Sequence, residues 1–307
     1  MTRRVPSVLS IAGSDSGGGA GIQADLKAFA ACGVHGMTAI TAITAQNTTG
    51  VTAVHPIPPE TILAQVRAVA QDIGVDAVKV GMVGTATTIE TVATALDELP
   101  EATPVVVDPV LVAESGAILL EPSAQDALIG QLLPRATVAT PNLPEARALT
   151  GLPNADAAQL AKAVLSLGPQ VVVVTGGHGE RAADTFYDGE RLVELPGKRH
   201  RDGAAHGSGC THSAVLASAL AWGWEPLAAA RLARRMAADA VGHGLTTLGA
   251  GAGPVDVLGR AGTEPRPPAD APGRAGTEPA RPDGVLDAEP TFAPDLLQPK
   301  GPEPSAP

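Results

Sequence analysis

The chain has 307 residues, of which 44% are hydrophobic, and a formal net charge of −11. This length is enough for one large hydrophobic core or two small ones. The acidic balance argues against nucleic acid and anionic membranes as partners, because both attract basic surfaces. An aromatic content of 2% leaves few rings on which bases could stack.

The cysteine pattern and the amino terminus bear on the cellular compartment. Cys32 and Cys210 lie far apart, without a Cys-x-x-Cys or a histidine cluster nearby. This pattern is typical of reduced thiols and carries no zinc signature. The first apolar run is interrupted at Gly13, too early for a signal peptide, and no later run reaches membrane-spanning length. We therefore expect a soluble, cytoplasmic protein.

Strands and helices are predicted to alternate along the chain. The predicted strands are 7–12, 38–44, 77–80, 105–107, 137–139 and 171–174, followed by a hairpin of 182–187 and 191–195. The predicted helices are 22–32, 59–72, 85–99, 123–133, 143–149, 156–167, 208–222 and 226–242. This order predicts an α/β fold with three layers, α/β/α, around a mostly parallel sheet.

The composition changes near residue 258. Residues 259–307 are dense in Pro, Ala, Gly and Glu, and they contain GRAGTEP twice, at 259–265 and 273–279. Such a segment buries too little apolar surface to offset the entropy lost on ordering the chain. We predict a globular domain over residues 1–258 and a disordered tail over residues 259–307.

Polar and glycine-rich segments follow the predicted strands. In open α/β sheets, ligands bind at the carboxyl ends of the strands, so these segments predict a single crevice. The segments are 13–21, 46–50, 81–84, 108–109, 140–142 and 176–179.

The segment 206–213 (HGSGCTHS) runs directly into the predicted helix 208–222. Its glycines permit a sharp turn that aims several unpaired amides at one point, where the helix dipole favours an anion. The same field would lower the pKa of the Cys210 thiol. The alternative is a glycine-rich helix start with a small buried cysteine.

Further polar residues point to recognition of a small ligand. The loop GSDSGGGAG at 13–21 lacks the Lys-Ser/Thr of a P-loop and the spacing of a dinucleotide fingerprint. Asp25, one helical turn later, either faces the crevice or is a solvated carboxylate. Gln46 and Asn47 follow a predicted strand, and each amide offers a donor and an acceptor to a heteroaromatic edge. The alternative for this amide pair is a stabilised turn.

Oxygen-bearing side chains occur at two other strand ends. Asp108 follows an apolar run, and Asn142 and Glu145 lie three residues apart at a predicted helix start. Mg²⁺ prefers oxygen ligands and keeps several of its waters, so these side chains could hold it through water. The alternative is helix capping by Asn142 with Glu145 in the third position, and the two roles are compatible.

Together these segments resemble the hydroxymethylpyrimidine/phosphomethylpyrimidine kinase family of thiamin biosynthesis, within the ribokinase-like superfamily. Cys210 stands where sugar kinases of that superfamily have Asp, which points to the pyrimidine branch. The matching segments run in order through the globular part: IAGSDSGGGAGIQADLKAF (11–29), GMTAITAITAQNTTGV (36–51), KVGM (79–82), VVDPVL (106–111), TPNLPEA (140–146), TGGH (175–178) and HGSGCTHSA (206–214).

The resemblance implies a ribokinase-like fold that uses ATP to phosphorylate 4-amino-5-hydroxymethyl-2-methylpyrimidine, and then converts the monophosphate to the diphosphate. Gln46 would read the aminopyrimidine edge, and Cys210 would act as the base. The rest of the pyrimidine pocket would comprise Gly13, Ala20, Asp25, Met82 and Val110. The anion hole would comprise the backbone of Gly207, Ser208, Gly209 and Cys210.

The resemblance also implies a nucleotide side and a magnesium site. ATP would be bound with the help of Thr175, Asn142, Glu145 and His206, although His206 could equally orient its loop or simply pack. Mg²⁺ would be held, through water, by Asn142, Glu145 and Asp108. The resemblance further implies a homodimer.

One position departs from the family pattern. Many members have Lys where this chain has Thr175, and that lysine contacts nucleotide phosphate. Thr175 can donate a hydrogen bond but carries no charge. We hypothesise that the basic run 198–201 (KRHR), through Arg199 and Arg201, supplies the charge instead. The alternative is a solvated basic loop.

Two other functions remain open at the level of sequence. The first is a kinase of the same fold that acts on pyridoxal or pyridoxine, whose ring also carries a hydroxymethyl group. The second is a non-catalytic pyrimidine-binding regulator, which would need neither Cys210 nor the Asn142–Glu145 pair.

Overall fold

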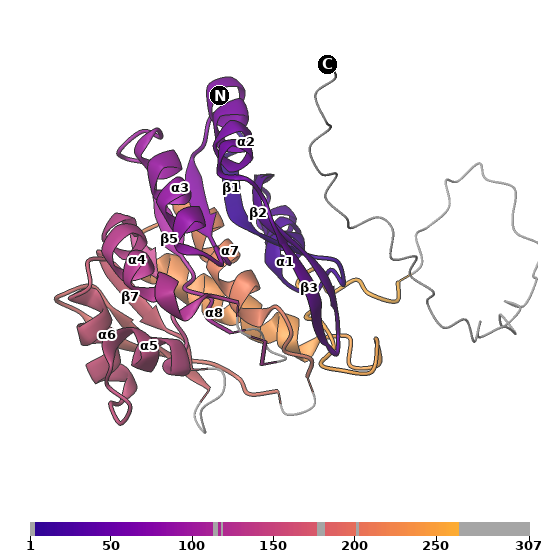
Figure 1. Cartoon of the computed structure of the whole chain (residues 1–307). Coiled ribbons are helices and arrows are strands. Elements are labelled where there is room, and N and C mark those ends of the chain that lie inside the picture. Colours follow the sequence, from indigo (N-terminus) through magenta and orange to yellow (C-terminus); the bar gives the residue numbers. More distant parts are fainter. Residues whose placement is uncertain (1–3, 113–115, 118, 177–181, 201–202, 264–307) are drawn as a thin grey trace, which may run out of the picture. The chain divides into compact units, whose positions relative to one another are not determined.

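A nine-stranded sheet forms the centre of this computed structural model (Figure 1). The structure describes residues 4–112, 116–117, 119–176, 182–200 and 203–263. Residues 264–307 of the predicted tail lie outside these described residues, as do 177–179 and Arg201. The strands are β1 (Ser7–Asp15), β2 (His35–Asn47), β3 (Gly50–Pro56), β4 (Ala77–Val80), β5 (Val105–Val107), β6 (Val138–Ala139), β7 (Val171–Val174), β8 (Ala183–Tyr187) and β9 (Leu192–Pro196).

The strand order is β3-β2-β1-β4-β5-β6-β7-β8-β9. The six strands from β2 to β7 in this order are mutually parallel. The flanking strands β3, β8 and β9 are antiparallel to their neighbours. The predicted mostly parallel sheet and the predicted hairpin are both confirmed.

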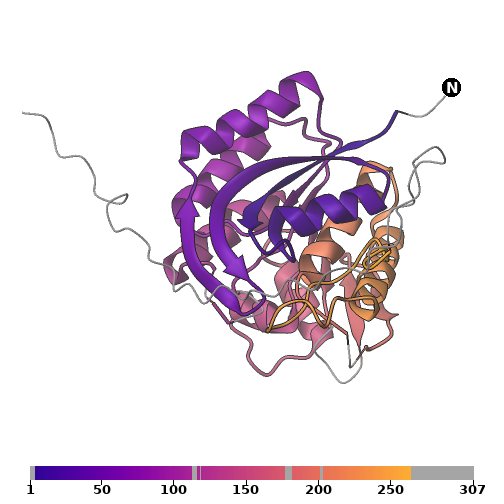
Figure 2. The same cartoon turned by 90° about the vertical axis from the view of Figure 1, so that its right-hand side faces the viewer.

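Helices cover both faces of this sheet (Figures 1 and 2). The strands present alternate residues to the two faces, which is why apolar runs such as β7 are buried on both sides. One face packs on α2 (Pro59–Asp72), α3 (Ala86–Asp97), α5 (Leu143–Thr150) and α6 (Ala157–Leu165). The other face packs on α1 (Gly21–Ala31), α7 (Ser208–Ala221) and α8 (Pro226–Gly242).

The predicted helix 123–133 is irregular in the structure. A 3-10 turn (Pro122–Ala124) leads into α4 (Gln125–Ala127), a π-helical turn (Leu128–Leu132) and a second 3-10 turn. Pro134 has no amide hydrogen and cannot continue an α-helix, and Gly130 lowers helix propensity within the segment. The apolar spacing therefore predicted burial correctly but not the helix type.

The sequence pattern missed β3 and placed the end of β2 too early. Most residues of β3 are exposed, so the strand has no alternating apolar face from which it could be predicted. It is held by antiparallel pairing to β2, which includes Gln46 opposite Val51. Gln46 and Asn47 consequently lie within β2, at its carboxyl end, and not in a loop after it.

No helix of the described residues is long and apolar enough to span a membrane.

A buried ion pair connects α1 to β4. The Lys79 ammonium lies 3.0 Å from Asp25 Oδ1, and both side chains are completely buried. Ser10 donates a 2.6 Å hydrogen bond to Oδ2 of the same carboxylate. Burying either charge alone would cost several kcal/mol, so each depends on its partner.

Asp25→Ala should lower the free energy of unfolding by about 3–5 kcal/mol, because it leaves the Lys79 ammonium buried without a counter-charge. Urea unfolding monitored by circular dichroism measures this change. The double variant Asp25→Ala/Lys79→Met removes both charges and should recover most of the loss. A single variant as stable as the wild type would contradict the ion-pair assignment.

Candidate active site

A cavity of about 510 Å³ lies at the carboxyl ends of the parallel strands. It is the single crevice that the sequence predicts, and it brings together segments from the whole length of the domain. Of the predicted site residues, the following line it: Gly13, Ala20, Gln46, Met82, Asp108, Val110, Asn142, Glu145, Thr175, His206, Gly207, Ser208, Gly209 and Cys210.

Asp25 does not line the cavity, and the prediction that it contributes to the pocket wall is wrong. Its carboxylate points into the protein, where it pairs with Lys79 and Ser10. Lys79 occupies the cavity wall instead. The sequence contains one sign of this ion pair, because Lys79 is the only charged residue in the short apolar strand AVKV. A lysine is almost never fully buried unless it is paired, so a lysine in such a strand indicates a buried partner.

Two glycine-rich segments touch each other beside the cavity. Gly207 adopts a left-handed conformation with φ +84°, and a Cβ added there would lie 1.8 Å from the carbonyl oxygen of Gly19. No other residue fits this position, because any side chain would collide with the neighbouring backbone. The loop between β1 and α1 is therefore in direct contact with the turn that begins α7.

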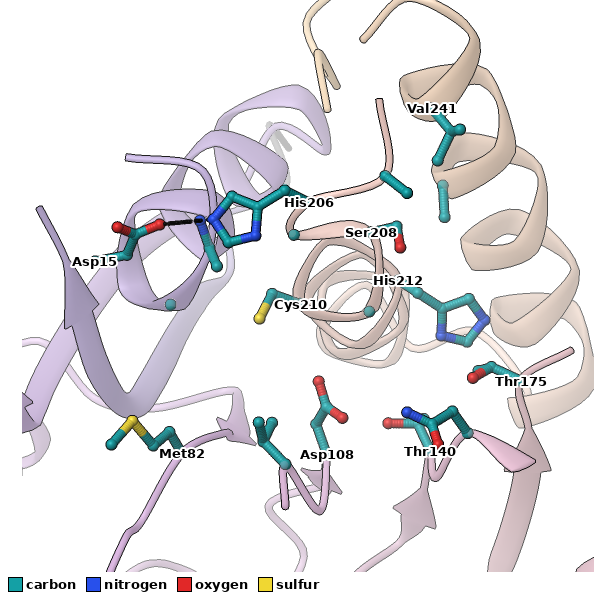
Figure 3. A pocket seen from close by; sticks show the side chains of 18 of the residues that line it. Asp15, Met82, Asp108, Thr140, Thr175, His206, Ser208, Cys210, His212 and Val241 are labelled. Atoms are coloured by element: carbon teal, nitrogen blue, oxygen red, sulfur yellow. Dashed lines mark hydrogen bonds and ion pairs between the residues drawn. The ribbon is translucent and has the colours of Figure 1, made fainter. Parts of the chain in front are cut away.

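A buried carboxylate and a histidine fasten these two segments. Asp15 accepts hydrogen bonds from the amides of Gly17, Gly19 and Ala20, and its Oδ2 lies 3.1 Å from His206 Nε2 (Figure 3). Burial disfavours the charged carboxylate, but the hydrogen bonds from His206 and the amides outweigh it and lower the pKa of Asp15. Asp15 thus organises the loop as a carboxylate, a role that sequence reasoning missed.

The start of α7 leaves backbone donors facing the cavity. The amide of Ser208 donates to the Ala205 carbonyl at 2.9 Å, so it is not available to a ligand as predicted. Among the described residues, no carbonyl accepts from the amides of Gly209 or Cys210. A Cβ added at Gly209 would meet nothing within 4 Å, so the space beside Gly209 is open. A helix N-terminus of this kind binds anions.

The Cys210 thiol is not activated in the way that the sequence predicts. Its side chain is partly open to the cavity, but burial of the sulfur among protein atoms raises its pKa to about 12. The Lys79 ammonium opposes this rise, while the carboxylates of Asp25 and Asp108 add to it. Desolvation therefore outweighs the helix dipole, and the predicted lowering of the pKa is wrong.

Lys79 is the buried cation closest to this chemistry. Burial alone would lower its pKa, but the coulombic interactions with Asp25 first, and then with Cys210 in its thiolate form and Asp108, outweigh that effect and raise the pKa above its ordinary value. Lys79 is therefore charged at neutral pH. It supplies fixed positive charge to a cavity wall that otherwise carries acids.

The Asn142–Glu145 pair forms a capping box at the start of α5, which the sequence offered as the alternative to a magnesium-binding role. The side chain of Asn142 accepts from the Glu145 amide at 2.9 Å, and that of Glu145 accepts from the Asn142 amide at 2.9 Å. Both side chains also line the cavity. The interpretations of capping and of a cavity-lining role therefore hold together.

Asp108 and Glu145 form an acidic pair in a buried environment. Burial and the nearby Asp108 raise the pKa of Glu145 to about 8. Burial likewise raises the pKa of Asp108, against the opposing charge of Lys79 and a 3.0 Å hydrogen bond from Ser213. Within the described residues, no group of three or more His, Cys, Asp or Glu side chains is arranged to hold a metal directly.

The two predicted amides at the end of β2 have different environments. Gln46 lines the cavity, and its Oε1 accepts a 3.1 Å hydrogen bond from Thr44. Asn47 does not line the main cavity; its Oδ1 accepts from the amides of Thr49 and Gly50. Gln46 can therefore still bind a heteroaromatic edge through its amide. Asn47 instead stabilises a turn, which was the alternative interpretation of the pair.

The basic run lies at the rim of the cavity. Lys198, Arg199 and His200 line it, with the first two exposed, and Arg201 lies outside the described residues. Two further basic side chains, His212 and Arg234, are buried in the cavity wall. Sequence reasoning gave neither residue a role: His212 lies within the segment 206–213 but was not singled out, and Arg234 lies in a helix whose neighbouring residues give no sign of a polar site.

The sequence of this chain matches known proteins over the whole domain. The family model described as phosphomethylpyrimidine kinase matches residues 15–256. The chain belongs to this family. A hydroxymethylpyrimidine/phosphomethylpyrimidine kinase of Rhizobium meliloti is 49% identical, over 80% of this chain and 95% of the relative. One of Mycobacterium bovis is 44% identical, over 83% and 94%. The chain is accordingly a kinase.

Solved structures of related kinases share the fold. A phosphomethylpyrimidine kinase from Clostridium difficile is 39% identical with a TM-score of 0.66, covering 75% of this chain and 96% of that chain. The pyridoxal kinase from Staphylococcus aureus, solved with pyridoxal, is 34% identical with a TM-score of 0.77, covering 85% and 97%. The three-layer, ribokinase-like α/β fold is thereby confirmed.

Alkylation of Cys210 by iodoacetamide should become steadily faster as the pH rises from 7 to 10, without a plateau. A thiol whose pKa is about 12 gains thiolate roughly tenfold per pH unit throughout that range. Peptide-level mass spectrometry of the ligand-free protein distinguishes Cys210 from Cys32. A plateau below pH 8 would instead show the lowered pKa that the sequence predicts.

Proposed function

We propose that this chain transfers the terminal phosphoryl group of ATP to 4-amino-5-hydroxymethyl-2-methylpyrimidine, and then to the resulting monophosphate, in thiamin diphosphate biosynthesis. The observation that carries the proposal is the pair of open amides at Gly209 and Cys210, which face the middle of a cavity with two chemically different ends. Phosphoryl transfer depends mainly on positioning and on stabilising charge at the equatorial oxygens.

One end of the cavity suits the pyrimidine. Met82, Ala20 and Val110 give it apolar walls, and Gln46 offers an amide whose NH₂ group is not engaged by any described residue. Gly13 keeps this end open, because a Cβ there would press on Met82 Sδ at 3.0 Å. An aminopyrimidine edge can pair with such an amide while its ring lies against the apolar wall.

The middle of the cavity suits the transferred phosphoryl group. The amides of Gly209 and Cys210 would hold its oxygens, and the Cys210 sulfur would accept the proton of the attacking hydroxyl. Because the thiol is protonated at rest, its proton would first pass to water in the cavity, and the Lys79 ammonium favours the thiolate that remains. The amides therefore contribute to the rate independently of the sulfur.

The donor set beside the middle of the cavity fits Mg²⁺ bound largely through water. Asp108 and Glu145 are acids that disfavour each other's charge, and a divalent cation would relieve that conflict. The hydroxyl oxygen of Thr140 is buried without a hydrogen-bond partner and could bind a coordinated water. When bound, the ion would neutralise phosphate charge, and Asn142 would keep Glu145 in place through the capping box.

A pyridoxal kinase is the alternative that a specific observation favours, because solved pyridoxal kinases share this fold. The family and the relatives that cover this chain favour the pyrimidine. A non-catalytic regulator has no such support. We further propose a cytoplasmic homodimer with a kinase domain over residues 1–258 and a disordered tail over 259–307.

The wild type should consume ATP with the free pyrimidine alcohol and with its monophosphate, and kcat/KM should be higher for both than for pyridoxal. Coupled spectrophotometric measurement of ADP release with Mg²⁺ present tests this. A higher kcat/KM with pyridoxal would replace the proposal by the pyridoxal alternative. Binding of the pyrimidine without ATP consumption would exclude catalysis.

Cys210→Ala should reduce kcat by about 10²-fold or more, the range for loss of a general base, while KM for the pyrimidine changes little. Cys32→Ala is the matched control, because Cys32 lies outside the cavity and should leave kcat unchanged. Equal kcat values for Cys210→Ala and the wild type would remove the sulfur from the mechanism.

A further inference from the structure

A cluster of three buried polar side chains forms one wall of the cavity near Thr175. It consists of Asp184 on β8, His212 on α7 and Arg234 on α8, which are 2%, 3% and 8% exposed. Asp184 Oδ2 lies 3.2 Å from His212 Nε2, and Asp184 Oδ1 lies 3.6 Å from Arg234 Nε. The amide of Gly176 also donates to Asp184, at 3.1 Å. We call these three side chains the 184–212–234 cluster.

Unpartnered polar atoms line the cavity. In the described residues, nine buried side-chain nitrogen and oxygen atoms have no hydrogen-bond partner, and six of them belong to residues that line the cavity. Such atoms are costly to bury, so a concentration of them calls for a ligand. The six are Thr140 Oγ1, Asp184 Oδ2, His200 Nε2, His212 Nδ1, His212 Nε2 and Arg234 Nε. Asp184 Oδ2 and His212 Nε2 face each other, and Arg234 Nε faces Asp184, which leaves Thr140 Oγ1, His200 Nε2 and His212 Nδ1 without either kind of contact.

The character of these atoms points to an anion. Arg234 and a ring nitrogen of His212 are donors, and a guanidinium has no acceptor at all. Arg234 is anchored by a hydrogen bond from one of its terminal nitrogens to the Ala182 carbonyl, and Asp184 faces its Nε side. Arg234 lines the cavity wall, where the remaining donors of its guanidinium suit a phosphate.

The position of the cluster relates it to the nucleotide. Figure 3 shows Cys210 between Met82 on one side and His212 with Thr175 on the other. The pyrimidine end and the cluster thus lie on opposite sides of the open amides. A donor nucleotide that places its terminal phosphate at those amides would lay its other phosphates toward the cluster.

We propose that Arg234, together with His212, binds the phosphates of the donor nucleotide, and that Asp184 positions both side chains. This inference rests on the proposed function for the identity of the nucleotide. Arg234 supplies the positive charge that Thr175 cannot. The exposed Lys198 and Arg199 at the rim are then not the principal phosphate contacts, because exposed charges are screened by solvent.

Calorimetric titration with ADP and with adenosine tests the proposal on the ligand-free protein. Arg234→Met should raise the Kd for ADP by about 10- to 100-fold, the expected loss for a hydrogen-bonded charge, and leave the Kd for adenosine unchanged. His212→Leu should also weaken ADP selectively. Arg234→Lys, which keeps the charge but not the planar fork, should fall between wild type and Arg234→Met.

Arg235→Met is the matched control, since Arg235 is the next residue of α8, is exposed and does not line the cavity. It should bind ADP like the wild type. A folded Arg234→Met or His212→Leu protein with wild-type affinity for ADP would overturn the proposal, as would equal weakening of ADP and adenosine. If Arg234→Met fails to fold, Arg234→Lys and His212→Leu decide by the same criterion.

Arg199→Ala decides between this cluster and the rim. Loss of ADP affinity in Arg199→Ala alone, with Arg234→Lys and His212→Leu unaffected, would transfer the phosphate contact to the basic run and overturn the proposal. These binding constants do not depend on turnover of the pyrimidine. Failure of the proposed function would appear separately, as a wild type that binds ADP but does not phosphorylate the pyrimidine.

Discussion

The backbone contact between Gly207 and Gly19 is the constraint on which the rest of the site depends. The start of α7 lies so close to the loop after β1 that only glycine fits at position 207. The Asp15–His206 contact fastens the same pair of segments through side chains. As a result, the amides that open toward the cavity are held at a fixed position relative to the apolar pyrimidine end.

The electrostatics of the cavity follow from its burial. Desolvation raises the pKa values of Cys210, Asp108 and Glu145 together, so the wall of the cavity resists further negative charge. Phosphate groups are nevertheless the expected ligands there. Lys79 supplies part of the positive charge that stabilises them, beside the sulfur, and the 184–212–234 cluster supplies it at the opposite end. A divalent cation would add positive charge between Asp108 and Glu145.

How far the sequence predicts this protein depends on whether a feature is local. The α/β order, the parallel sheet and the membership of the cavity follow from apolar periodicity and from polar residues at strand ends. The features that were missed depend on contacts between segments that are far apart in the sequence. Strand β3 has no apolar face, and the partner of Asp25 is 54 residues away, on strand β4. The sign of the Cys210 pKa shift depends on how deeply packing buries the sulfur.

The residues that join the cavity from separate elements show the same limit. Arg234 lies in the alanine-rich helix α8, close to Arg231 and next to Arg235, and nothing local distinguishes it from Arg235. Only the packing of α8 against α7 and β8 makes one of them buried and leaves the other exposed. By contrast, the glycines at 207 and 209 were recognisable because a helix start with small residues has a local physical meaning.

A crystal structure with ADP, aluminium fluoride, Mg²⁺ and the pyrimidine alcohol is the most direct measurement of the central claim, that the start of α7 is the phosphoryl-transfer centre. The planar fluoride should lie within hydrogen-bond distance of the amides of Gly209 and Cys210, between the pyrimidine hydroxyl and the ADP phosphates. A fluoride bound elsewhere in the cavity, with these two amides facing only water, would contradict the claim.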